Sequence, residues 1–176
     1  MKKILAVASI ISLVLIFPSR TLAKGATSRI VIEAIDLTKP IEITDRKVLA
    51  NFNVWTGPGT FSTQQGSNAN APGFIIDWSQ GPVSQPPQAL RRYQVSFYSD
   101  ELQNERPIYV VYYAVGPGSD KGYVYLPGKS DQWWRLNVSS IVRGVEGKWF
   151  HAWSLWEGKA RPLIKKARTA NSSDPT

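Results

Sequence analysis

Residues 107–128, PIYVVYYAVGPGSDKGYVYLPG, constrain the fold of this chain more than any other part of the sequence. Residues 108–115 carry no charge and are almost all β-branched or aromatic, which favours a strand. Residues 116–122 are typical of a turn, and residues 123–126 then resume the apolar pattern. Two such runs on either side of a turn predict a β-hairpin.

Other short runs of the same character predict further strands. They are residues 29–37, 41–43, 74–78, 93–98, 132–138 and 149–153. In one of these runs Tyr93, Val95 and Phe97 alternate with more polar neighbours, so we expect these three side chains to face the core. The residues between the runs are rich in Gly and Pro, and the Ser, Asn and Gln content of residues 60–73 predicts a flexible loop.

A single short helix is predicted at residues 45–52. Thr44 is a good N-cap, and Asp45 falls in the first turn, where the helix dipole favours a carboxylate. The many short strands predict an all-β fold, either an antiparallel sandwich or a partly closed barrel. Within it we expect residues 93–98, 108–115 and 123–126 to form an antiparallel meander.

The N-terminus has the organisation of a secretory signal peptide. Lys2 and Lys3 precede an apolar run at 4–17, Pro18 ends that run, and Ala23 offers a small residue for cleavage. The pattern predicts cleavage after Ala23 and a secreted or periplasmic mature protein with no transmembrane segment. An uncleaved membrane anchor is the alternative, although the run is shorter than the roughly 20 residues that a spanning helix needs.

The charges are concentrated at the two ends of the chain. The formal net charge is +8, and the basic excess lies in residues 1–23 and 159–176. Such a distribution is not typical of a nucleic-acid-binding domain, so we expect no nucleic-acid partner. We predict a single domain at 24–158, followed by a basic and flexible tail at 159–176. Because the chain has no cysteine, it has no disulfide bonds, and core burial must hold the domain together.

Several short motifs resemble those of a family of small exported bacterial proteins of unknown function. They are Ile41-Glu42-Ile43-Thr44-Asp45, Asn53-Val54-Trp55 with Gly57-Pro58-Gly59, Arg92-Tyr93, the segment 122–128 and the segment 147–152. The resemblance covers roughly residues 29–156. It implies export and a compact β-rich domain, and it implies no activity, ligand or active site.

Residues suited to catalysis are few. His151 is the only histidine and there is no cysteine, which excludes a multi-histidine metal site and a thiol nucleophile. Asp77 stands beside an aromatic residue, as carboxylates of glycosidases do, and Asp131 lies in a loop next to the predicted hairpin. A secreted hydrolase, including one that acts on glycans, would have to use Asp77, Asp131 or His151. We predict no cofactor and no metal.

Tryptophan is the strongest remaining signal. Trp133 and Trp134 are consecutive in a predicted strand, so one of the two rings should point away from the core. Together with Arg135, Trp149 and Trp153, that ring would form an apolar strip with a cation at one end. The alternative is that other parts of the chain cover these rings, since tryptophan is highly buried on average.

The leading functional hypothesis is therefore an exported, non-catalytic β domain with a binding or structural role in the cell envelope or outside the cell. An aromatic strip suits a glycan, a peptide or another envelope component, and it requires none of the missing catalytic residues. The hydrolase remains the alternative. A cleft that contains two of Asp77, Asp131 and His151 within hydrogen-bonding reach would favour the enzyme.

Overall fold

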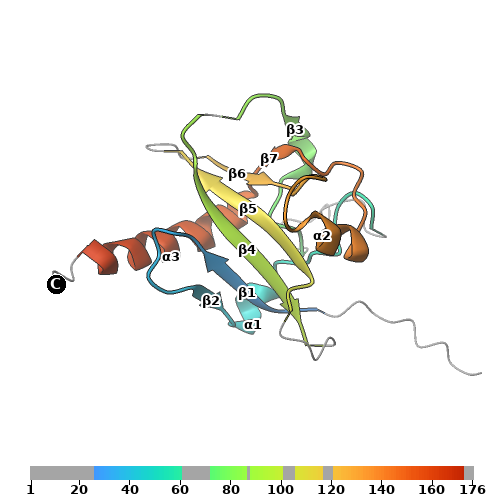
Figure 1. Cartoon of the computed structure of the whole chain (residues 1–176). Helices are drawn as coiled ribbons and strands as arrows, with labels where there is room; N and C mark the ends of the chain where they lie inside the picture. The colour runs from blue at the N-terminus through green and yellow to red at the C-terminus, as the bar shows by residue number, and fades with distance from the viewer. Residues whose placement is uncertain (1–25, 61–71, 87, 101–105, 117–120, 173–176) are drawn as a thin grey trace, which may run out of the picture.

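The computed structural model describes residues 26–60, 72–86, 88–100, 106–116 and 121–172 (Figure 1). Its centre is a seven-stranded antiparallel sheet with the strand order β2-β1-β4-β5-β6-β7-β3. The strands are β1 (Thr27–Glu33), β2 (Ile41–Ile43), β3 (Pro82–Val83), β4 (Arg91–Ser99), β5 (Tyr109–Val115), β6 (Gly122–Tyr125) and β7 (Trp149–His151). The sheet is not closed, because β2 and β3 lie at its two edges. The β-rich, antiparallel character predicted from the sequence is confirmed.

The predicted meander of three strands is confirmed as well. β4 pairs antiparallel with β5, and β5 pairs antiparallel with β6, so that Tyr93 lies opposite Tyr113 and Tyr113 lies opposite Val124. The residues that connect β5 to β6 were predicted as a turn, and residues 117–120 of it lie outside the described residues. Residues 61–71 of the predicted loop and the predicted signal peptide lie outside them too.

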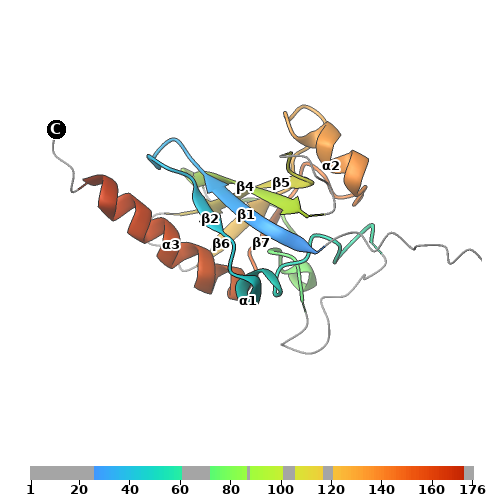
Figure 2. The ribbon, with the colours of Figure 1, turned by 90° about the horizontal axis from the view of Figure 1, so that it is seen from below.

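Helices lie on both faces of the sheet. Figure 2 shows α1 (Arg46–Leu49) and α3 (Ser154–Ser172) on one side, and α2 (Trp134–Ser140) on the other. The short helix predicted near 45–52 is confirmed in α1, although it covers only four residues. The predicted N-cap Thr44 is wrong, because Asp45 itself is the N-cap and accepts a hydrogen bond from the Lys47 amide at 2.8 Å. None of the helices in the described ranges is long and apolar enough to cross a membrane.

The core lies between the sheet and α3. Tyr93, Val95 and Phe97 face it and are fully buried, as the alternation in the sequence predicted. From α3, Trp156 meets Phe52 and Tyr113 edge to face, with ring centroids 5.3 and 5.9 Å apart. The face of β4, β5, β6 and β7 that points away from α3 is the outer face of the sheet.

A buried arginine joins residues 54–58 to the rest of the core. Arg143 is 4% exposed and donates hydrogen bonds to the carbonyls of Val54, at 2.5 Å, and Thr56, at 2.9 Å, and to the Tyr109 hydroxyl, at 3.0 Å. Its guanidinium carbon also lies 5.2 Å from the centre of the Trp78 ring. Buried charges need such partners, so Arg143 serves as a structural cross-link.

The strand predicted at 132–138 is wrong, because this segment contains α2. Trp133 and Asn137 are one helical turn apart and both reach the sheet, where Asn137 bonds to Val110 and Trp133 bonds to Gln94. These contacts outweigh the strand preference of the aromatic residues, since β-propensity depends strongly on context. The argument that Trp133 and Trp134 point to opposite faces of a strand therefore fails.

The flexible tail predicted at 159–176 is also wrong for its described part. Residues up to Ser172 continue α3, which begins at Ser154 and contains Pro162 in its interior. Trp156, Ala160 and Ile164 follow each other at intervals of four and are buried against the sheet. The core contacts of this apolar stripe hold the helix in place.

Two smaller predictions need correction. Residues 74–78 form no strand; Ile76 makes a single bridge to Ala152, and the 3₁₀ helix η1 (Trp78–Gln80) follows. The strand predicted at 29–37 ends at Glu33, and Ile35 is fully exposed in the turn that follows. Its side chain does not cover the second face of the sheet.

Candidate functional site

A row of aromatic side chains crosses the outer face of the sheet. Strand register places Gln94 opposite Tyr112, Tyr112 opposite Tyr125, and Tyr125 opposite Trp149. Ring centroids are 6.4 Å apart for the two tyrosines and 5.0 Å apart for Tyr125 and Trp149. All three rings are partly exposed, so they form an accessible apolar surface that spans β5, β6 and β7.

A second row runs parallel to the first one. Arg92 lies opposite Ala114, Ala114 opposite Tyr123, and Tyr123 opposite His151. The Tyr123 and His151 rings lie 5.2 Å apart. We call the surface formed by Tyr112, Tyr125, Trp149 and His151, together with the largely buried Tyr123, the aromatic face.

A cation lies across the aromatic face. The guanidinium carbon of Arg92 is 5.2 Å from the centre of the Trp149 ring, although β5 and β6 separate their strands. Ala114, which has a small side chain, lies opposite Arg92 on β5. Arg92 is exposed and, among the described residues, it forms no ion pair, so its hydrogen-bond donors are accessible to a ligand.

Polar groups line one end of the aromatic face. Asp131 accepts hydrogen bonds from the Tyr125 hydroxyl at 2.9 Å and from the Gly128 amide at 2.6 Å. The Trp133 indole Nε1 donates to the amide oxygen of Gln94 at 2.9 Å. Burial, and then the hydrogen bond to Asp131, raise the pKa of Tyr125 above its usual value, and its protonated hydroxyl is the donor in that bond.

The neighbouring part of the outer face is covered by α2. Asn137 is buried, and its amide group exchanges two hydrogen bonds with the backbone of Val110, at 2.9 and 2.7 Å. In Figure 2, α2 is the only labelled helix on this side of the sheet. The covered part around Val110 and the open aromatic face therefore lie side by side on one surface.

The structure divides the tryptophan strip that the sequence predicted. Trp149 belongs to the aromatic face, and Trp133 lies at its edge through Gln94. Trp134 and Arg135 belong to α2 and, among the described residues, have no ring contact or hydrogen bond with this face. Trp153 lies on the other side of the sheet, where its ring meets Phe52 edge to face at 6.2 Å.

Sequence reasoning missed Tyr112, Tyr125 and Arg92. The signal for the two tyrosines was present, because alternation along β5 places Tyr112 on the face opposite the buried Tyr113. No sequence pattern indicated that Arg92 would reach Trp149, since that contact depends on the order of strands in the sheet.

The residues predicted for a hydrolase are partly brought together. Asp77 and His151 both line a small cavity of about 220 Å³, which Ser154 and Glu157 also line. The carboxylate of Asp77, however, accepts hydrogen bonds from Ser79 and Gln80, and no hydrogen bond joins the side chains of Asp77 and His151 in the described part of the chain. Asp131 does not line this cavity.

The protonation state of Asp77 also limits the catalytic roles that it could have. Burial alone would raise its pKa, but the hydrogen bonds from Ser79 and Gln80 outweigh burial and hold the pKa below its usual value. Asp77 is therefore ionised at neutral pH and cannot serve as a general acid there. Within the ranges that the structure describes, no group of three or more His, Cys, Asp or Glu side chains is arranged to bind a metal ion.

Comparison of this chain with protein-family models, with curated proteins and with solved structures finds no match in any of the three. The resemblance to a family of small exported proteins therefore stays a prediction, and functional inference rests on the geometry of the chain itself.

Proposed function

We propose that this chain is an exported, non-catalytic binding domain that holds a glycan on the aromatic face of its sheet. One observation carries the proposal: Tyr112, Tyr125 and Trp149 form a continuous, partly exposed row, and the exposed Arg92 lies across it. Export to the periplasm or the cell exterior rests on the predicted signal peptide at residues 1–23.

The chemistry of the aromatic face suits a sugar. The C–H surfaces of a sugar ring are apolar and can be buried on aromatic rings, whereas its hydroxyl groups need hydrogen-bond partners when water is displaced. Arg92 supplies donors, Asp131 supplies carboxylate oxygens and His151 supplies a ring nitrogen. A row of rings with polar groups around it offers both kinds of contact.

The experiment is a screen of the mature protein, residues 24–176, on an array of glycans and peptides. The best ligand is then titrated against two variants, Arg92→Ala and Arg29→Ala. Arg29 is a matched control, because it also lies over an aromatic ring, that of Tyr98 at 4.1 Å, but on β1, away from the aromatic face. We expect Arg92→Ala to weaken glycan binding about tenfold, which is the scale of one lost charge-assisted hydrogen bond.

Three results would contradict the proposal. The first is no glycan binding on the array, and the second is binding to peptides alone. The third is an equal loss of affinity in Arg92→Ala and Arg29→Ala, because that result would assign binding to general surface charge instead of to the aromatic face.

A secreted hydrolase stays the second candidate, and the shared cavity of Asp77 and His151 is the observation in its favour. The fate of a bound glycan distinguishes the two candidate functions, because a hydrolase cleaves the glycan and a binding domain leaves it intact. Any cleavage should be lost in His151→Asn if His151 is catalytic. Cleavage that survives this substitution would rule out the only histidine as its base.

A further inference from the structure

A groove with several basic side chains lies on the other side of the sheet, between α3 and the neighbouring ends of β4 and β5. Four cations line it: Arg91 at the start of β4, and Arg161, Lys165 and Arg168 on α3. The three helical residues are spaced i, i+4 and i+7, so they share one face of α3. We call this cavity of about 900 Å³ the basic groove.

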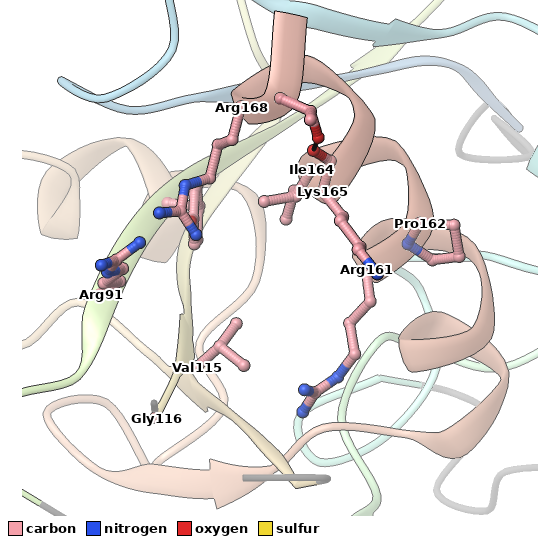
Figure 3. Close-up of a pocket in the computed structure, with 10 residues that line it drawn as sticks. Arg91, Val115, Gly116, Arg161, Pro162, Ile164, Lys165 and Arg168 are labelled. Atoms are coloured by element: carbon pink, nitrogen blue, oxygen red, sulfur yellow. Dashed lines mark hydrogen bonds between the residues drawn. The ribbon is translucent and has the colours of Figure 1, made fainter. Parts of the chain in front are cut away.

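The lining of the basic groove combines these cations with apolar groups. Figure 3 shows Arg91 on the strand side and Arg161 and Lys165 on the helix side, with Val115 between them. Tyr93 and Ile164 line the groove as well, and both are almost completely buried. A ligand in this groove would therefore meet charge at the rim and apolar groups beneath.

The carboxylates near the groove neutralise only part of this charge. Arg161 is paired with Glu157, one turn earlier in α3, and Arg168 is paired with Asp36, with an Nε–Oδ2 distance of 3.2 Å. Arg91 and Lys165 are exposed and, among the described residues, belong to neither ion pair. A cleft lined by charges of one sign attracts and concentrates ions of the opposite sign.

We infer that the basic groove binds a small organic phosphate, with its phosphate between Arg91 and Lys165 and its apolar part on Val115 and Ile164. Guanidinium groups match the geometry of phosphate oxygens, and a lysine adds a mobile point charge. The volume of the groove is within the range of cavities that hold small ligands. This site is separate from the aromatic face, and neither proposal depends on the other.

The test uses phenyl phosphate as a probe, with inorganic phosphate and phenol as its two halves. Binding to the mature protein is measured by calorimetry at about 0.15 M salt, where distant charges are screened beyond about 8 Å. We expect saturable binding of phenyl phosphate, binding of inorganic phosphate that is weaker by about tenfold, and no detectable binding of phenol.

Two adjacent lysines of α3 provide a matched pair of variants. Lys165→Glu and Lys166→Glu change the net charge equally, and both residues are exposed, but only Lys165 lines the groove. We expect Lys165→Glu to weaken phenyl phosphate binding about tenfold or more and Lys166→Glu less than about threefold. Arg91→Gln should also weaken phenyl phosphate binding, because Arg91 lines the groove from β4 and not from α3. Melting temperatures verify that all three variants are folded.

The inference is overturned if phenyl phosphate shows no saturable binding at millimolar concentrations, or if the two lysine variants lose affinity equally. Equal affinities for phenyl phosphate and inorganic phosphate would overturn the role of the apolar lining. Binding to vesicles of phosphatidylglycerol without binding of phenyl phosphate would overturn the whole inference, because α3 would then be a membrane-surface contact.

Discussion

The guanidinium carbon of Arg92 lies 5.2 Å from the centre of the Trp149 ring, across the two strands that separate β4 from β7. The arginine is exposed, and a cation over an aromatic ring at such a position stabilises by only about 0.5–1 kcal/mol. A ligand can therefore displace or recruit this side chain at little cost. The contact marks the part of the aromatic face where charge and ring surface meet.

The first prediction is that Arg92→Ala leaves the fold intact. We expect the free energy of unfolding to fall by no more than about 1 kcal/mol, because only the exposed contact with Trp149 is lost. Urea unfolding of the variant measures this change. A loss several times larger would mean that Arg92 supports the sheet itself, and the variant could then not serve as a binding probe.

The second prediction concerns the bond between α2 and the sheet. β6 ends at Tyr125, opposite Tyr112, so no residue of β6 lies opposite Val110. The Asn137 amide occupies that position and bonds to both the amide and the carbonyl of Val110. We expect Asn137→Ala to destabilise the protein by about 2–4 kcal/mol, since it leaves two buried backbone groups unpaired.

Ser139→Ala is the control for Asn137→Ala. Ser139 is an exposed residue of the same helix, and within the described part of the chain its hydroxyl bonds only to the carbonyl of Leu136, so we expect a change within about 0.5 kcal/mol. Thermal or urea unfolding compares the two variants. Equal effects of both substitutions would contradict a specific contribution of the bond to Val110, because alanine favours the helix at either position.

The third prediction tests the docking of α3. Ile164 is 5% exposed and its neighbour Leu163 is 37% exposed, so the two point to different faces of the helix. We expect Ile164→Ala to cost about 2–4 kcal/mol of stability and Leu163→Ala less than about 1 kcal/mol. Similar losses in both variants, measured by urea unfolding, would show that α3 is not packed as described.

The fourth prediction is a loss of stability at alkaline pH. Burial, and then the charge and hydrogen bond of Glu157, raise the pKa of Tyr113 far above its usual value, and burial raises the pKa of Tyr109. Unfolded tyrosines lose their protons near pH 10, whereas these two keep theirs in the folded state. The stabilisation is therefore complete below about pH 10 and is lost as the pH rises further.

Tyr113→Phe removes one of these titrating groups. We expect its stability to fall less steeply above about pH 10, by about 1.4 kcal/mol per pH unit relative to the parent protein. Unfolding in urea at several alkaline pH values measures the two slopes. Parallel slopes would contradict burial of a protonated Tyr113 hydroxyl beside Glu157.

The sheet was the most predictable part of the fold. Alternation in residues 93–98 and the charge-free run at 108–115 report local properties of a strand buried on one or both faces. The segment 132–138 was not predictable in this way, because its helix depends on the contact between Asn137 and Val110, which lie on different elements. Aromatic content alone indicated the wrong structure there.

The helix α3 left a signal that went unused. Trp156, Ala160 and Ile164 have helical spacing. The predicted boundary between the domain and the tail at residue 159 divided this apolar stripe, which is recognised only when the helix begins near Ser154. Of the aromatic face, Trp149 could be predicted from sequence. The positions of Tyr112, Tyr125 and Arg92 beside it follow from strand order and register, which the sequence does not encode locally.

The most direct test of the glycan proposal observes the tryptophan side chains themselves. The chain has 7 tryptophans, and each gives one indole N–H signal in a nitrogen-15 NMR spectrum. On titration with the glycan selected on the array, we expect the Trp149 signal to shift saturably, with a smaller shift for Trp133, while the fully buried Trp156 stays unchanged. A glycan that shifts Trp153 or Trp78 and leaves Trp149 in place would contradict binding on the aromatic face.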